Sequence, residues 1–219
     1  MLPRDERHDD PLSMNGSSPI EAVVFDVGGV LLDWDPRHLY RKVFDDQRAM
    51  EEFLAEVCTL EWHAQHDRGA QIEESCSELV ATHPEHADPI WAWARRSEEM
   101  IAGPIDETVT IVRELKDTGL ACYLLTNMET HTWPLRLARF PFLGWFDGAV
   151  VSGFEGVAKP DLEIFERLLA RFALVPQRTV FIDDSPANID AARQLAIQAI
   201  HFRSPAQLRE SLADIGLVA

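Results

Sequence analysis

Short runs of apolar and β-branched residues recur along the chain, each bounded by turn residues, and helical patterns separate the later runs. Residues 106–116, 161–172 and 188–195 carry apolar side chains at the spacing typical of amphipathic helices. Strands that alternate with helices form a parallel sheet with right-handed crossovers. The sequence therefore predicts an α/β fold with strands at residues 22–26, 121–127, 148–152, 179–184 and 199–202.

The alternation breaks between residues 37 and 99, where helical patterns occur and no strand is predicted. The pair Gly103-Pro104 closes this region. An all-helical insertion after the first strand is placed to cover the carboxyl edge of the sheet, where α/β folds bind ligands. We therefore predict a helical cap at residues 36–103 and a core formed by residues 19–35 and 104–219.

The start of the chain, residues 1–18, is polar and rich in Pro, Ser and Asp, so we expect a disordered leader, with Met14 as an alternative start. It lacks the charged and apolar regions of a secretory signal, and no apolar run approaches the ~18 residues of a membrane span. Cys58, Cys76 and Cys122 are scattered, which favours reduced thiols and a cytoplasmic location.

The net charge is strongly negative, −17, from 37 acidic and 20 basic residues. Such a surface repels the phosphates of nucleic acids, so we expect no nucleic-acid partner and no membrane partner. An anionic substrate must then be attracted by a local positive site rather than by the overall field. The sequence leaves a monomer and a homodimer open.

Polar residues stand where predicted strands end or the next helix begins. They are Asp26, the pair Thr126-Asn127, Lys159 and the pair Asp183-Asp184. The ends of parallel strands share one edge of a sheet, so these groups are expected to converge. Carboxylates that meet at neutral pH need a cation between them, and hard oxygen ligands suit Mg²⁺.

The segments "FDVGGVL", "LLTN", "KPDLEIFE" and "VFIDDSPANI" resemble, in order and spacing, the four motifs of the haloacid dehalogenase-like (HAD) hydrolase superfamily. The resemblance spans residues 21 to 203. It implies a Rossmann-like parallel-sheet core with an inserted all-helical cap, of the subfamily I phosphatase type. It also implies that Asp26 is a nucleophile that accepts a phosphoryl group.

The same resemblance implies the other roles. Asp26, the backbone carbonyl of Gly28 and Asp184 would bind Mg²⁺, while Thr126 and Asn127 would bind phosphoryl oxygens and Lys159 would neutralise charge. The more ordinary interpretation is that Lys159-Pro160 starts a helix and that Asp183-Asp184 caps one. Only the set of four motifs favours the functional interpretation.

Two positions depart from the family pattern. Many family phosphatases have an acid two residues after the nucleophile, where this chain has Gly28, and general acid catalysis is worth ~10²–10⁴ in rate. The bacterial glucose-1-phosphatase-like branch shares this glycine and a cap segment similar to "HAQHDRG". Asn188 replaces a common acid of the fourth motif.

The cap segment supplies two candidate substrate-binding residues, His63 and Arg68, and His63 is also a candidate proton donor in place of the missing acid. The alternative is that both belong to a helix end with ordinary amphipathic packing. Trp91 and Trp93 lie on different sides of a predicted helix, which favours packing.

The predicted function is that of a Mg²⁺-dependent phosphatase that hydrolyses a small phosphorylated metabolite, with a sugar phosphate as one candidate, through an aspartyl-phosphate. One alternative is a 2-haloacid dehalogenase, but those members carry a Tyr where this chain has Phe165 and lack the acids of the fourth motif. Another alternative is a HAD-like protein kept for binding or regulation with little turnover.

Overall fold

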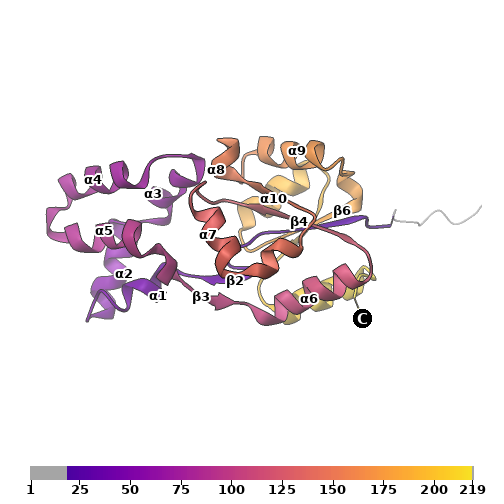
Figure 1. The fold of residues 1–219 in the computed structure, drawn as a ribbon, viewed down its shortest axis with the longest axis horizontal. Coiled ribbons are helices and arrows are strands. Elements are labelled where there is room, and N and C mark those ends of the chain that lie inside the picture. The colour runs from indigo at the N-terminus through magenta and orange to yellow at the C-terminus, as the bar shows by residue number, and fades with distance from the viewer. Residues whose placement is uncertain (1–18, 219) are drawn as a thin grey trace, which may run out of the picture.

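The computed structural model describes residues 19–218, and a parallel sheet of five strands in the order β5-β4-β1-β6-β7 forms the centre of its larger lobe (Figure 1). This confirms the predicted α/β fold class. The strands begin and end close to the predicted residues: β1 (Ala22–Phe25), β4 (Ala121–Thr126), β5 (Gly148–Val151), β6 (Thr179–Asp183) and β7 (Gln198–His201). The predicted leader at residues 1–18 lies outside the described residues.

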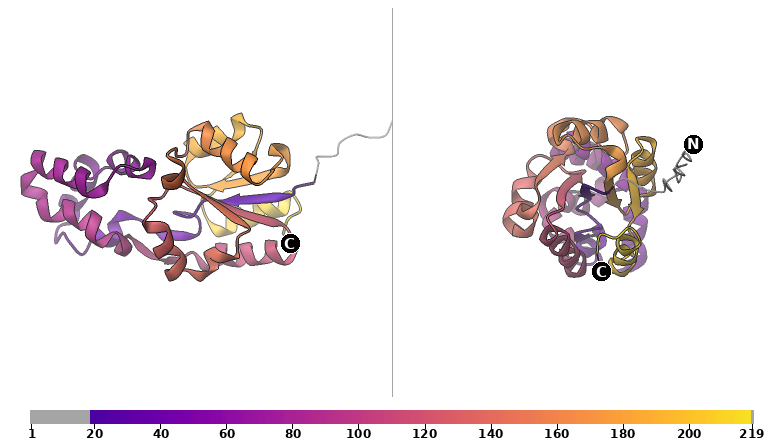
Figure 2. Two further views of the ribbon diagram at one scale, coloured as in Figure 1. Left: turned by 45° about the horizontal axis from the view of Figure 1, so that its top comes forward. Right: turned by 90° about the vertical axis from the view of Figure 1, so that its right-hand side faces the viewer.

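The central strand β1 is buried on both faces, which is why it reads as an unbroken apolar run. Val23 and Phe25 face one hydrophobic cluster and Val24 faces another. One face is covered by α6 (Asp106–Asp117), α7 (Thr132–Arg139) and α11 (Pro205–Asp214), and the other by α9 (Leu162–Arg171) and α10 (Pro186–Gln194). Figure 2 shows the sheet between these layers. Shorter elements complete the core: α8 (Ser152–Glu155), η4 (Pro141–Trp145) and η5 (Pro176–Arg178).

The smaller lobe in Figure 1 is helical throughout and is built around its own hydrophobic cluster, which includes Tyr40, Phe53 and Trp93. Its helices are α1 (Pro36–Tyr40), α2 (Gln47–Glu56), α3 (Leu60–Ala64), α4 (Ile72–Thr82) and α5 (Ala87–Arg96). Three 3₁₀ turns accompany them: η1 (His66–Arg68), η2 (Pro84–His86) and η3 (Ser97–Met100). We call this lobe the cap. Its division from the core at residues 36 and 103 stays a prediction.

A small antiparallel sheet connects the two lobes: β2 (Leu32–Trp34) pairs with β3 (Ile101–Pro104). These strands were not predicted from the sequence, because each is too short to show an alternating pattern. Asp35 follows β2 and caps α1, where its carboxylate accepts a hydrogen bond of 2.8 Å from the Arg37 backbone amide. Among the described residues, no helix is long and apolar enough to cross a membrane.

Candidate active site

Asp26 lies directly after β1, at the carboxyl edge of the sheet. Its backbone amide extends the ladder to β6 with a 2.9 Å hydrogen bond to the Ile182 carbonyl. Its side-chain oxygen Oδ1 accepts a hydrogen bond of 2.6 Å from the Val27 amide and lies 2.9 Å from Lys159 Nζ. Both the backbone and the carboxylate of Asp26 are therefore held in place.

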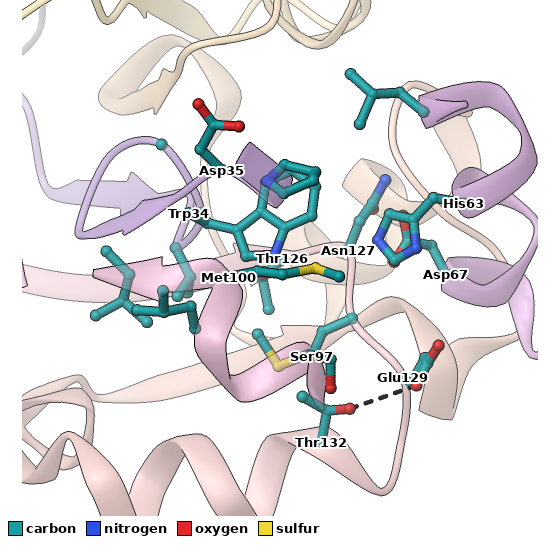
Figure 3. Close-up of a pocket in the computed structure, with 18 of the residues that line it drawn as sticks. Trp34, Asp35, His63, Asp67, Ser97, Met100, Thr126, Asn127, Glu129 and Thr132 are labelled. Carbon is teal, nitrogen blue, oxygen red and sulfur yellow. Dashed lines mark hydrogen bonds between the residues drawn. The ribbon is translucent and has the colours of Figure 1, made fainter. Parts of the chain in front are cut away.

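Lys159 is buried between two carboxylates: its Nζ lies 2.9 Å from Asp26 and 2.7 Å from Asp183. Asn127 fixes the backbone of this lysine, because its amide donates to the Lys159 carbonyl and its side-chain oxygen accepts from the Lys159 amide, each at 2.9 Å. The Asn127 side chain was expected on a phosphoryl oxygen. The structure instead places it on the loop that positions the lysine, while the Thr126 side chain stands beside it at the cavity (Figure 3).

The two acids at the end of β6 have different surroundings. Asp183 is fully buried and accepts hydrogen bonds from Lys159, the Ser185 amide and the Asn188 side chain. Asp184 is exposed at the cavity. Asn188, which departs from the family pattern, therefore holds Asp183 with a neutral donor and adds no charge beside Lys159.

Asp26, Asp183 and Asp184 form a cluster in which one carboxylate oxygen of each lies within 4.8 Å of the others. Burial raises the pKa of Asp26 to about 8, because desolvation together with Asp183 and Asp184 outweighs the attraction of Lys159. Desolvation and Asp183 also raise the pKa of Asp184. A divalent cation would remove this repulsion, so the donor set of this cluster fits Mg²⁺.

Gly28 and Gly29 carry the chain past this cluster. Gly29 has a φ of 72°, a conformation that side chains with a Cβ rarely adopt, and an added Cβ would collide with the Asp184 carboxylate. At Gly28, the nearest atom to an added Cβ is Trp34 Cβ at 3.9 Å. The chain therefore needs glycine at position 29, whereas at position 28 the backbone leaves room for a side chain.

Gly29→Ala should weaken metal binding and lower the melting temperature, because the new methyl group strains the backbone and displaces Asp184. Asp184 belongs to the Mg²⁺ site that we propose below, and displacing a metal ligand or its support typically costs ~10–100-fold in affinity, so the Mg²⁺ concentration for half-maximal activity should rise by about that factor. Gly144→Ala is the control, since its Cβ meets nothing within 4 Å. An unchanged Mg²⁺ titration for Gly29→Ala would contradict the proposed role of Asp184 in metal binding.

A cavity of about 680 Å³ lies between the core and the cap, and the strand-end residues line part of it; Figure 3 labels two of them, Thr126 and Asn127. Most of the predicted site residues line it: Asp26, Gly28, His63, Thr126, Asn127, Lys159 and Asp184. The cap and the connecting strands contribute an apolar wall formed by Trp34, Leu54, Cys58, Ile72, Trp93 and Met100. Trp93 therefore packs in the hydrophobic cluster of the cap and also lines the cavity.

His63 lies against this wall, stacked on Trp34 with ring centroids 5.6 Å apart and close to Trp93 at 5.1 Å. Burial lowers the pKa of His63 to about 4, and the nearby His66 adds to that effect. Its Nδ1 atom is buried and has no hydrogen-bond partner among the described residues. At neutral pH this imidazole is uncharged, so it is a poor proton donor for a leaving group.

Arg68 does not line the cavity within the described part of the chain. Its guanidinium lies 3.5 Å from Asp161 in the core and 3.5 Å from the Ala64 carbonyl. The prediction that it contacts substrate is therefore not supported by its position. Several acids that were not predicted as site residues do line the cavity, among them Asp67 and Glu129. The only signal for Asp67 was its place in the "HAQHDRG" segment, next to Arg68.

Comparison with known proteins places this site in a family context. The model of the family described as hydrolase, haloacid dehalogenase-like hydrolase, matches residues 20–195. The chain is 29% identical over 183 residues to a sesquiterpene phosphatase of Aspergillus oryzae, with 83% of this chain and 89% of that protein covered. It is 28% identical over 189 residues to a phosphorylated carbohydrates phosphatase of Thermotoga maritima, with 83% and 84% covered.

A HAD-family enzyme of Bacteroides thetaiotaomicron, crystallised with magnesium and inorganic phosphate, shares the fold with a TM-score of 0.60 and 23% identity, and 84% of this chain and 95% of that chain are covered. This chain spans only 18% and 36% of the length of two further curated relatives. The family match covers most of the chain, and the two relatives of comparable length described above are phosphatases. The chain belongs to the haloacid dehalogenase-like hydrolases.

Proposed function

We propose that this hydrolase is a Mg²⁺-dependent phosphatase that forms an aspartyl-phosphate on Asp26. The observation that carries the proposal is the Asp26 carboxylate, held at the sheet edge by Lys159 and opening into the cavity beside Asp184. Asp26, Asp184 and the Gly28 carbonyl would hold Mg²⁺. When bound, the ion would neutralise charge on the carboxylates and the phosphoryl oxygens.

The residues of the chain have separate tasks in this reaction. Lys159 keeps Asp26 oriented and offsets negative charge, so that the carboxylate can approach an anionic phosphoryl group. Attack by Asp26 on phosphorus splits hydrolysis into two displacements, with water completing the second. Burial of Asp26 and Lys159 fixes the attacking atom before the substrate arrives, which lowers the cost of orientation.

We further propose that the substrate has an apolar body. The wall opposite the strand ends is formed largely by aromatic and aliphatic side chains. Several charged residues along the cavity away from the strand ends have partners on the protein: Arg37 binds Glu51, Asp33 lies 3.1 Å from His38, and Arg136 binds Glu98. An alkyl or terpenoid chain fits such a chamber, in keeping with the 29% identity to a sesquiterpene phosphatase.

A sugar phosphate is the second candidate, and the relative named as a phosphorylated carbohydrates phosphatase favours it. Dehalogenation is disfavoured for two reasons. Both acids of the fourth motif are present at the site. Phe165, which stands where the dehalogenases carry a Tyr, is fully buried and has no hydroxyl group. The remaining alternative is a protein that serves binding with little turnover. It predicts no phosphate release in the assay described below.

Purified protein should release phosphate from alkyl monophosphates in the presence of Mg²⁺, and EDTA should abolish the release until Mg²⁺ is restored. Along a series from butyl to decyl phosphate, kcat/KM should rise about fourfold for each added methylene, since burying a methylene is worth about 0.8 kcal/mol. Phosphate release measured in parallel with glucose 1-phosphate provides the comparison. If kcat/KM does not change along the alkyl series and the sugar phosphate is hydrolysed faster, the sugar phosphate becomes the favoured substrate in place of the apolar one.

A further inference from the structure

The reaction proposed above lacks an obvious proton donor, because position 28 carries no side chain. The ester oxygen departs with a full negative charge unless another group protonates it. The donor must reach the leaving-group side of the cavity, which the cap covers. Among the described acids of the cap, Asp67 occupies such a place: it lies on η1 and lines the same cavity as Asp26 and Lys159.

The position of Asp67 is fixed by contacts between the cap and the core. The turn η1 packs against α8, and Arg68 reaches across to Asp161. In Figure 3 the Asp67 side chain projects from the cap, next to His63, towards the loop that carries Asn127. Asn127 in turn holds the backbone of Lys159. Asp67 therefore approaches the catalytic edge of the sheet from the opposite lobe.

The surroundings of Asp67 favour its protonated form. Partial burial is the main cause that raises its pKa to about 7, and Glu129 adds to it, while Lys159 and Arg68 oppose it. The charged and titratable groups around it come from the cap, the loop after β4, α8 and the loop before α9. They are His63, His66, Arg68, Glu129, His131, Glu155, Lys159 and Asp161.

The neighbouring candidates are less suited to donate a proton. His63 is uncharged at neutral pH for the reason given above. Glu129 is engaged on its own loop, where it lies 3.2 Å from His131 and accepts a 3.4 Å hydrogen bond from Thr132. In contrast, no hydrogen bond or ion pair within the described residues engages the Asp67 carboxyl. It can therefore turn towards a bound substrate.

We propose that Asp67 is the general acid and base of the phosphatase reaction, supplied by the cap in place of a side chain at position 28. As the bond from Asp26 to phosphorus forms, the bond from phosphorus to the ester oxygen breaks, and that oxygen keeps the electron pair and takes the proton of Asp67. In the second step the Asp67 carboxylate takes a proton from water while the water oxygen binds phosphorus and displaces Asp26. The products are the alcohol and inorganic phosphate, and Asp67 is protonated again.

This inference rests on the proposed function, and the test separates the two. Asp67→Asn and wild type are assayed with Mg²⁺ on an alkyl phosphate, whose leaving group needs a proton, and on 4-nitrophenyl phosphate, whose leaving group does not. In the first turnover, which reports attack on the ester alone, Asp67→Asn should lose ~10²–10⁴-fold in the rate of leaving-group release from the alkyl ester and less than about tenfold from the aryl ester. Asp67→Glu should restore part of the loss, and Asp88→Asn, on an exposed position of the cap, should match wild type.

The pH dependence gives an independent readout. With the alkyl ester, wild-type kcat should fall as pH rises through about 7, because Asp67 must carry a proton, and this decline should be missing in Asp67→Asn. Equal losses of the first-turnover rate on both esters would overturn the proposal, and so would a selective loss in Glu129→Gln but not in Asp67→Asn. If wild type hydrolyses neither ester, the proposed function itself fails.

Discussion

Asp26→Asn should abolish phosphate release, with a loss in kcat of about 10⁴–10⁶-fold, the scale observed when a covalent nucleophile is removed from a hydrolase. The amide nitrogen and oxygen are poor nucleophiles towards phosphorus, whereas the shape of the side chain is almost unchanged. The fold should persist, because Lys159 keeps its 2.7 Å contact with Asp183. Circular dichroism and a thermal melt would show a melting temperature close to that of wild type.

The matched control for this variant is Asp190→Asn. Asp190 is exposed on α10, where it is paired with Arg193 at 3.4 Å, so the same chemical change should leave turnover intact. Mass spectrometry should verify that the amide introduced by Asp26→Asn has not deamidated back to a carboxylate. Turnover of Asp26→Asn within tenfold of wild type, with the amide intact, would rule out Asp26 as the nucleophile.

Lys159→Met should have the largest combined effect on stability and activity. The lysine side chain is almost fully buried between Asp26 and Asp183, and its removal leaves two buried carboxylates without a cation. Breaking a buried ion pair in this way costs ~3–5 kcal/mol. For a protein of this size, that loss corresponds to a melting temperature lower by roughly 6–20 °C.

The control is Lys42→Met, which removes an exposed pair with Glu99 at 2.9 Å. Such surface pairs contribute about 0–1 kcal/mol. Urea denaturation of both variants in EDTA compares the two free energies of unfolding without interference from added metal. Equal stability of the two variants would show that Lys159 does not hold buried charge together.

The central features of the core were predictable because they depend on local sequence. The strands of the sheet are apolar runs that end at polar or turn residues, and Asp26 and Asp183-Asp184 follow directly from that pattern. The connecting strands β2 and β3 were missed, because their pairing joins Leu32 to Pro104 across the whole cap and leaves no periodic signal. Pairing at such separation is decided by tertiary packing.

The details of the site were less predictable than its location. Asn127 was assigned to substrate, yet its side chain binds the backbone of Lys159, which is remote in sequence. Arg68 and Asp67 are adjacent, and only the structure shows that the arginine turns to Asp161 while the acid lines the cavity. Adjacent residues of a sequence motif can point in different directions. The contact between the cap and the core decides which of them faces the cavity.

The position of β1 at the centre of the sheet determines when the core can be completed during synthesis. This strand precedes the other strands of the sheet in the chain, and its partners β4 and β6 come much later, with Ala22 paired to both Ala121 and Thr179. One side of β1 therefore stays unpaired until the ribosome has passed β6. The cap has its own hydrophobic cluster and is complete long before that point. Contacts this far apart in sequence slow folding. The whole cap has therefore been synthesised while β1, an apolar strand, still lacks both of its neighbours.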